Sequence, residues 1–103
     1  MKTIWRYELL PNRIQTVTIP FDGRILTVQT KGDNIPLMWV LVDPDMPMRE
    51  RCLGIYTTNT AVPDEPGKYI DTFMIHEGML EFHLFEMETP PAGTENLPES
   101  FDI

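Results

Sequence analysis

The sequence predicts an all-β fold: an antiparallel β-sandwich or partly open barrel of about seven strands, followed by an acidic C-terminal tail. Apolar and polar residues alternate with a period of two in short segments bounded by Gly, Pro, Asn or Asp, which is typical of half-buried strands. The 10 prolines and the many β-branched and aromatic residues disfavour long helices. The 103 residues suit one domain, which we predict over residues 1–86, with residues 87–103 as the tail.

The predicted strands lie near residues 2–9, 14–20, 24–31, 36–43, 50–58, 69–76 and 79–86. The first alternates from Lys2 to Glu8 and lacks the apolar stretch of a signal peptide. The longest apolar run, Leu37 to Val42, is far shorter than the ~20 residues of a membrane span. Because the single cysteine excludes an internal disulfide, we expect a cytoplasmic protein with no membrane contact.

The second and third strands are predicted to form a hairpin. Asp22-Gly23 has the composition of a two-residue type I′ turn, in which both central residues need a positive φ. That register pairs Ile19 with Leu26 and Val17 with Val28 on an apolar face. The opposite face is polar, as a half-buried sheet requires.

The fourth strand, from Leu37 to Val42, is apolar on both faces. Such a strand is central and covered on both sides, or one of its faces meets a partner chain. Pro44 and Pro47 end it, because proline cannot donate a ladder hydrogen bond. The fifth strand follows, and the proline-rich stretch 62–67 separates it from the sixth.

The sixth and seventh strands are predicted to pair around Glu77-Gly78. Phe73 then faces Phe82, and Ile75 faces Leu80, which gives an apolar core patch. The turn chemistry is weaker here because glutamate tolerates a positive φ poorly. The opposite face holds Thr72, Met74, His76, Met79, Glu81 and His83.

Charge is distributed unevenly along the chain. All eight Lys and Arg residues lie in the first 68 positions, and from Tyr69 onward there are eight acids and no base. The net charge of −8 disfavours direct binding of nucleic acid or an anionic membrane and suits a protein partner with a basic surface. The candidate interaction surface comprises Glu81, His83, Glu86, Glu88, Glu95, Leu97, Glu99 and Phe101.

The tail has two interpretations. Its acidic, proline-rich composition is typical of a disordered, solubilising end. Alternatively, Leu97, Phe101 and Ile103 among the acids form a short docking motif. Such a motif would fold onto its own domain, a neighbouring subunit or another protein.

No residue set reaches the threshold of a catalytic motif, so we predict no enzymatic activity, no cofactor and no metal. His76 and His83 share a face of the second hairpin but lie about four residues apart, roughly 13 Å. One metal ion does not bridge that gap. Asp43, Asp45 and Glu50 follow the fourth strand but lack the spacing of a calcium loop.

Cys52 has no Cys-x-x-Cys partner and is expected to be a buried, inert thiol. Arg49 and Arg51 nearby would instead favour a reactive thiolate. The aromatic residues are expected mainly in the core, with an aromatic ligand pocket as the alternative. They are Trp5, Tyr7, Trp39, Tyr56 and Tyr69.

Five segments together resemble one family. They are Lys2-Thr3-Ile4-Trp5, Leu26-Thr27-Val28-Gln29, Trp39-Val40-Leu41-Val42-Asp43-Pro44, Ile55-Tyr56, and Thr72-Phe73…His76…Gly78…Phe82-His83-Leu84-Phe85-Glu86. The chain resembles, over about residues 1–86, a small all-β domain family of unknown function found in tailed phages, prophages and some bacteria. The resemblance implies a bacterial host cell and no assigned activity. Glu77 departs from the family where a glycine would suit the turn, and residues 57–60 lack the Gly and His expected there.

Three functional hypotheses follow. The first is a non-enzymatic phage or prophage accessory protein that acts by protein–protein contact and forms a homo-oligomer. The second is an inhibitor of a host defence protein, in which the acidic last third mimics nucleic acid. The third is a small-ligand-binding or catalytic β-barrel.

Overall fold

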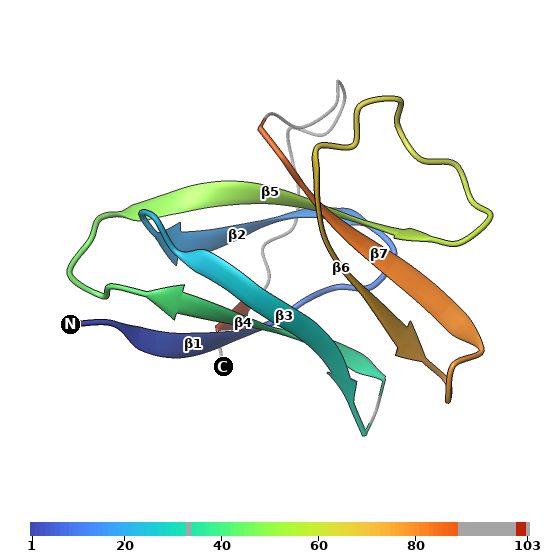
Figure 1. Cartoon of the computed structure of the whole chain (residues 1–103), viewed down its shortest axis with the longest axis horizontal. Coiled ribbons are helices and arrows are strands. Elements are labelled where there is room, and N and C mark those ends of the chain that lie inside the picture. Colours follow the sequence, from blue (N-terminus) through green and yellow to red (C-terminus); the bar gives the residue numbers. More distant parts are fainter. Residues whose placement is uncertain (33, 89–100, 103) are drawn as a thin grey trace.

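Two antiparallel sheets packed face to face form the protein, as the computed structural model describes it for residues 1–32, 34–88 and 101–102 (Figure 1). Sheet A has the order β3-β4-β1-β8 and sheet B the order β2-β5-β7-β6. The strands are β1 Thr3–Glu8, β2 Ile14–Pro20, β3 Arg24–Lys31, β4 Ile35–Val42, β5 Met48–Thr57, β6 Lys68–Ile75, β7 Leu80–Met87 and β8 Phe101–Asp102. The predicted all-β sandwich of seven antiparallel strands is confirmed, and the sheets do not close into a barrel.

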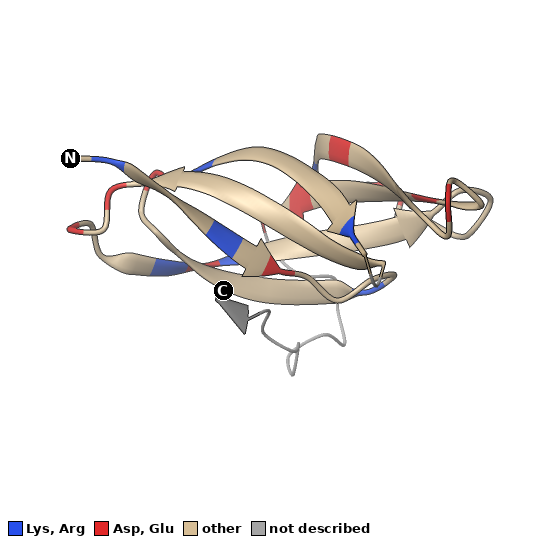
Figure 2. Ribbon diagram, turned by 90° about the horizontal axis from the view of Figure 1, so that it is seen from below, with Lys and Arg blue, Asp and Glu red and all other residues tan. Residues whose placement is uncertain are grey.

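The core lies between the inner faces of the two sheets. From β4, the side chains of Met38, Val40 and Val42 point inward and are at most 1% exposed. From sheet B, the rings of Phe73 and Phe82 stack at a centroid separation of 5.5 Å. Charged positions lie mainly at strand ends and in turns (Figure 2). The buried side chains of β4 and the stacked rings of sheet B show that alternation along the strands places apolar side chains on the face that the two sheets share.

The predicted hairpin of the second and third strands is wrong. β2 pairs with β5 in sheet B, whereas β3 pairs with β4 in sheet A, so the chain changes sheets between them. Asp22 has a positive φ of 64°, but Gly23 does not. Gly23 is needed for space, because a Cβ there would lie 3.3 Å from Cγ1 of Val40 and closer still to Ile19. Two strands that face one core from opposite sheets show the same alternation as a hairpin, so the pattern could not distinguish them.

The predicted hairpin of β6 and β7 is confirmed residue by residue. Phe73 pairs with Phe82, and Ile75 pairs with Leu80. Glu77 and Gly78 both have positive φ, at 56° and 88°, and the Met79 amide donates to the carbonyl of His76. The turn is therefore of type I′, with glutamate in a conformation that favours Gly, Asn or Asp.

Side chains join the two sheets where the edge strands β3 and β6 meet. The Asp71 carboxylate accepts hydrogen bonds from the Val28 amide at 2.8 Å and from the Thr27 hydroxyl at 3.0 Å. Each strand carries an irregularity beside this contact, at Leu26 in β3 and at Ile70 in β6. The irregularity in β3 explains why Leu26, expected in the core, is 42% exposed.

The outer face of β4 is apolar but only partly covered. β4 lies between β3 and β1, as its two-sided apolar pattern indicated. Trp39 and Leu41 are half-buried there, and Ile4 of β1 is 54% exposed. Among the described residues, no helix is long and apolar enough to cross a membrane.

The C-terminal residues 101–102 form β8, which pairs with β1 through Phe101 opposite Glu8 and Asp102 opposite Tyr7. This pairing places the end of the chain on its own domain, one of the positions that the docking interpretation allowed. Residues 89–100 and 103, including Glu95, Leu97 and Glu99, lie outside the described part of the chain.

We predict that Phe73→Ala lowers the free energy of unfolding by about 3–5 kcal/mol, because it removes one ring of the stacked core pair. Urea denaturation monitored by tryptophan fluorescence measures the change. Met74→Ala is the matched control, since Met74 is 49% exposed on the opposite face of the same strand. Equal losses for the two variants would contradict this assignment of faces.

Candidate functional site

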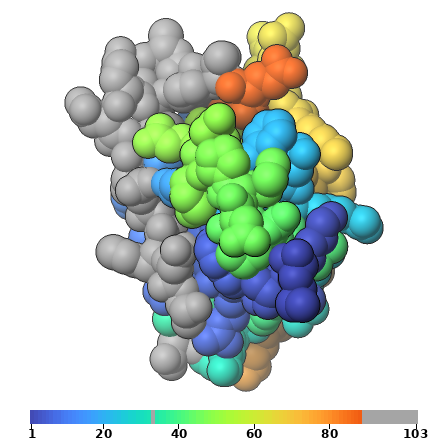
Figure 3. Space-filling model, turned by 90° about the vertical axis from the view of Figure 1, so that its left-hand side faces the viewer, coloured from blue at the N-terminus to red at the C-terminus, as the bar shows by residue number. Residues whose placement is uncertain are grey.

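A cavity of about 620 Å³ opens on one side of the sandwich, where sheets A and B separate. Figure 3 shows that the segments around it, the turn after β2, the start of β5, the start of β6 and the end of β7, come together on this side of the molecule. Its volume lies within the range of small-ligand pockets. The lining residues are Phe21, Asp22, Gly23, Arg24, Ile25, Arg49, Arg51, Lys68, Ile70 and Glu86.

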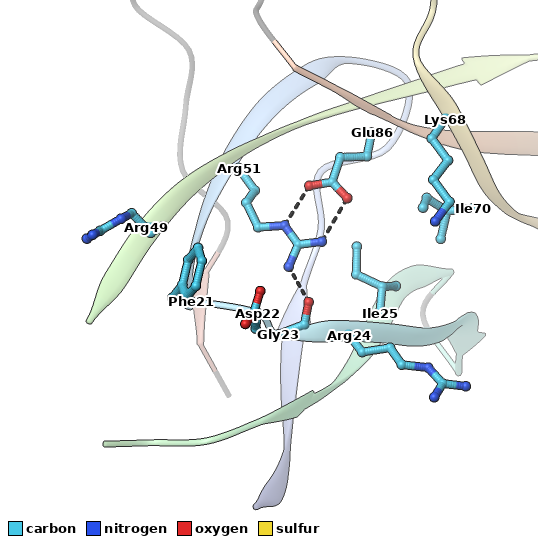
Figure 4. A pocket seen from close by; sticks show the side chains of 10 residues that line it. All are labelled: Phe21, Asp22, Gly23, Arg24, Ile25, Arg49, Arg51, Lys68, Ile70 and Glu86. Atoms are coloured by element: carbon cyan, nitrogen blue, oxygen red, sulfur yellow. Dashed lines mark hydrogen bonds and ion pairs between the residues drawn. The ribbon is translucent and has the colours of Figure 1, made fainter. Parts of the chain in front are cut away.

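Arg51 occupies the centre of the cavity and is held from two sides (Figure 4). Its Nε donates to Glu86 Oε2 at 2.5 Å and its Nη2 donates to Glu86 Oε1 at 2.7 Å. Its Nη1 donates to the carbonyl oxygen of Gly23 in the turn that leads into sheet A. The hydrogen bond with Glu86 raises the pKa of Arg51 above its usual value, against the opposing effect of burial. Arg51 is therefore a fixed cation that links β5, β7 and the β2–β3 turn.

Three further cations surround the opening. The guanidinium carbon of Arg49 lies 6.0 Å from the centre of the Phe21 ring. Arg24 and Lys68 are exposed, on β3 and β6 respectively. The only ion pair within the described part of the chain is that of Arg51 with Glu86. The rim cations therefore form no ion pair there. The described lining holds four cations against two carboxylates, those of Asp22 and Glu86, so the opening carries a net positive charge.

The strand irregularities help to shape this cavity. Ile25 and Ile70 form apolar wall on opposite sheets: Ile25 precedes the irregular position Leu26 of β3, and Ile70 is itself the irregular position of β6. Asp71, the residue after Ile70, joins the same two strands by accepting hydrogen bonds from Thr27 and Val28. The two strands are thus joined at Asp71, whereas Ile25 and Ile70 on the N-terminal side of this contact line the cavity. Irregularities of this kind are common beside functional sites.

The arrangement suits a ligand that carries an oxyanion. A guanidinium has five N–H groups, and the bonds to Glu86 and Gly23 use three of those of Arg51. The remaining two have no partner among the described residues. Carboxylate and phosphate oxygens accept hydrogen bonds from guanidinium groups, while Phe21, Ile25 and Ile70 offer apolar contact. The titratable side chains of the described lining are those of Asp22, Arg24, Arg49, Arg51, Lys68 and Glu86.

The structure separates the residues that the sequence grouped as one interaction surface. Glu86 points into the cavity and pairs with Arg51. Glu81 and His83 lie on the outer face of sheet B, and Glu88 is exposed just after β7. Glu95, Leu97 and Glu99 lie outside the described residues, and Phe101 is placed by its backbone pairing alone.

His83 is the centre of a hydrogen-bond chain on that outer face. Thr58 Oγ1 donates to Glu81 at 2.9 Å and contacts His83 Nε2 at 2.7 Å, so Nε2 carries the hydrogen. His83 Nδ1 lies 3.0 Å from Thr72 Oγ1, which contacts the Tyr69 hydroxyl at 2.7 Å. His76 lies in the turn instead, where it binds Asn34. In the described part of the chain, no three His, Cys, Asp or Glu side chains gather as a metal-binding set.

Cys52 is buried beside Tyr56 and Met87 in a small apolar cluster on the outer face of sheet B. Burial is the main cause that raises the pKa of the Cys52 thiol, and the nearby Glu86 carboxylate adds to it. This confirms the predicted buried thiol, and a raised pKa disfavours the reactive thiolate. Of the aromatic residues, Tyr7 is in the main core and Tyr69 is 53% exposed.

The sequence interpretation missed the basic cavity. Its cations come from the strands β3, β5 and β6, which are distant in sequence and converge only in the folded sandwich. The uneven distribution of basic residues was visible, but no spacing in the sequence indicated that half of the eight would surround one opening.

The fold and site define an antiparallel β-sandwich with a basic cavity. The chain belongs to a family described as a domain of unknown function (DUF7352), whose model matches residues 1–95. The match runs beyond residue 86, so part of the segment that the sequence interpretation treated as extra belongs to the family region. No curated protein and no solved structure matches the chain.

We predict that Glu86→Gln lowers the free energy of unfolding by about 1–3 kcal/mol, because the partly buried guanidinium of Arg51 loses a charged, bidentate partner among other cations. Urea denaturation at pH 7 measures this. Glu88→Gln, two residues further along and exposed, is the control. If the double variant Arg51→Gln/Glu86→Gln shows the sum of the single losses, the proposed coupling is absent.

Proposed function

We propose that this protein is a non-enzymatic binding protein that acts by protein–protein contact, and that its cavity takes an acidic group of the partner. The observation that carries the proposal is the concentration of Arg24, Arg49, Arg51 and Lys68 around one opening, in a chain of net charge −8. A cationic opening on an anionic protein selects where an acidic group binds. A phage or prophage setting rests on the sequence resemblance alone, and the proposal does not depend on it.

The geometry supports a bound side chain better than a catalytic role. Arg51 is fixed by Glu86 and Gly23, so its two remaining N–H groups are already oriented. Preorganisation of this kind lowers the entropy cost of binding. Phe21, 47% exposed at the rim, adds an aromatic surface for the apolar part of a partner.

The acidic mimic of nucleic acid is the second candidate. The exposed carboxylates of the β6–β7 hairpin and its end, Glu77, Glu81 and Glu88, support it. Within the described part of the chain they are three charges on a long hairpin, whereas duplex DNA carries one charge per about 1.7 Å. Asp71 and Glu86 are engaged inside the protein and add little to that surface. The geometry therefore favours the basic cavity.

We predict that a short oligoglutamate peptide binds the protein and that Arg24→Glu/Lys68→Glu weakens this binding at least about tenfold, because both changes reverse charges at the opening. Isothermal titration calorimetry measures the affinity. Lys31→Glu is the control, since it reverses an exposed charge at the other end of β3. An equal loss for the control, or tighter binding of oligolysine than oligoglutamate, would contradict the proposal and favour the acidic mimic.

A further inference from the structure

We infer that the acidic occupant of the cavity is the β6–β7 turn of a second copy of this chain, with Glu77 at its tip. The inference rests on the proposed function, because it names the partner of the same cavity. The two surfaces lie at opposite ends of one hairpin: Lys68 begins β6 and Glu86 lies near the end of β7, whereas residues 76–79 connect the strands at the far end.

The turn cannot reach the cavity of its own chain. Lys68 is the first of the eight residues of β6, and the turn begins directly after the last of them, a distance of roughly 25 Å in an extended strand. Figure 1 shows the turn projecting at one end of the molecule, away from the β2–β3 turn that borders the cavity. A contact between the two surfaces therefore requires two molecules.

The chemistry of the turn matches that of the cavity. Glu77 is exposed and has no hydrogen bond or ion pair within the described structure. Met79 and Leu80 beside it are 83% and 41% exposed, which is unusual for large apolar side chains in one short segment. The cavity offers the complementary set: N–H groups of Arg51 for the carboxylate, and Phe21 with Ile25 for the apolar side chains.

The backbone of the turn supports a role for the Glu77 side chain. Its φ of 56° belongs to the left-handed region, where Gly, Asn or Asp serve the turn better. The neighbouring His76 also has a positive φ, of 51°, so the turn holds two consecutive non-glycine residues in this region. Backbone strain of this kind is found at functional sites. A charged tip that binds a neighbouring molecule accounts for glutamate at this position.

The contact would be heterologous, because the tip of one copy and the cavity of the next are different surfaces. Such contacts propagate from copy to copy and give a ring or an open chain. At low ionic strength the net charge of −8 on each copy opposes this assembly. About 0.15 M salt shortens the range of that repulsion to about 8 Å, so assembly is best measured there.

The test uses complementary charge reversals. Glu77→Lys removes the tip and leaves the cavity, whereas Arg24→Glu/Lys68→Glu alters the cavity and leaves the tip. We expect the unaltered protein to self-associate in sedimentation velocity at tens of micromolar, and each variant alone to be monomeric. An equimolar mixture of the two variants should associate again, because the unaltered cavity of the Glu77→Lys variant can take the unaltered tip of the other variant.

Two further variants separate assembly from folding. Glu77→Asn should abolish self-association without lowering the melting temperature, since asparagine tolerates the left-handed region. Asp64→Lys, the same type of charge reversal at an exposed loop position, should leave assembly unchanged.

A monomeric unaltered protein, or a mixture that does not combine, overturns the inference. If that monomer still binds oligoglutamate through the cavity, the proposed function stands and only the identity of the partner is wrong. Loss of both properties overturns both proposals.

Discussion

The site depends on the hydrogen bonds that the Arg51 guanidinium donates to Glu86 and to the Gly23 carbonyl. The guanidinium joins β5 to β7 through Glu86 and joins sheet B to the β2–β3 turn through the Gly23 carbonyl. Glu86 balances one positive charge inside the sandwich and holds the guanidinium plane in a single orientation. Because the carboxylate takes two N–H groups and the carbonyl one, the same side chain both connects the sheets and keeps donors for a ligand.

A second constraint sets where the cavity ends. Between β3 and β6, the Asp71 carboxylate accepts hydrogen bonds from the Val28 amide and the Thr27 hydroxyl. Thr30 adds a hydrogen bond to the carbonyl of Met74 further along the same edge. These contacts close one part of the sandwich edge, while the irregular positions next to Asp71 allow the strands to diverge around the cations. One part of the β3–β6 edge is thus held together by hydrogen bonds, and the neighbouring part borders the cavity.

Charge has different consequences at different scales in this protein. The whole chain is strongly acidic, which favours solubility and repulsion between copies at long range. At short range, the opening holds cations of β3, β5 and β6, whereas the β6–β7 turn exposes an acid and apolar side chains. Net charge alone therefore does not describe the surface, because a chain of net charge −8 also holds a locally cationic opening.

The sequence by itself determined the all-β class, the seven strands and the β6–β7 hairpin. Period-two alternation and a two-residue turn are local properties, and they fixed the pairing of Phe73 with Phe82. The sequence did not determine which sheet each strand joins, since Val17 and Val28 face one core from opposite sheets. Only the tertiary structure decided the partners of β2 and β3, and with them the cavity, because Arg51 and Gly23 meet through packing between sheets that leaves no periodic signal in the chain.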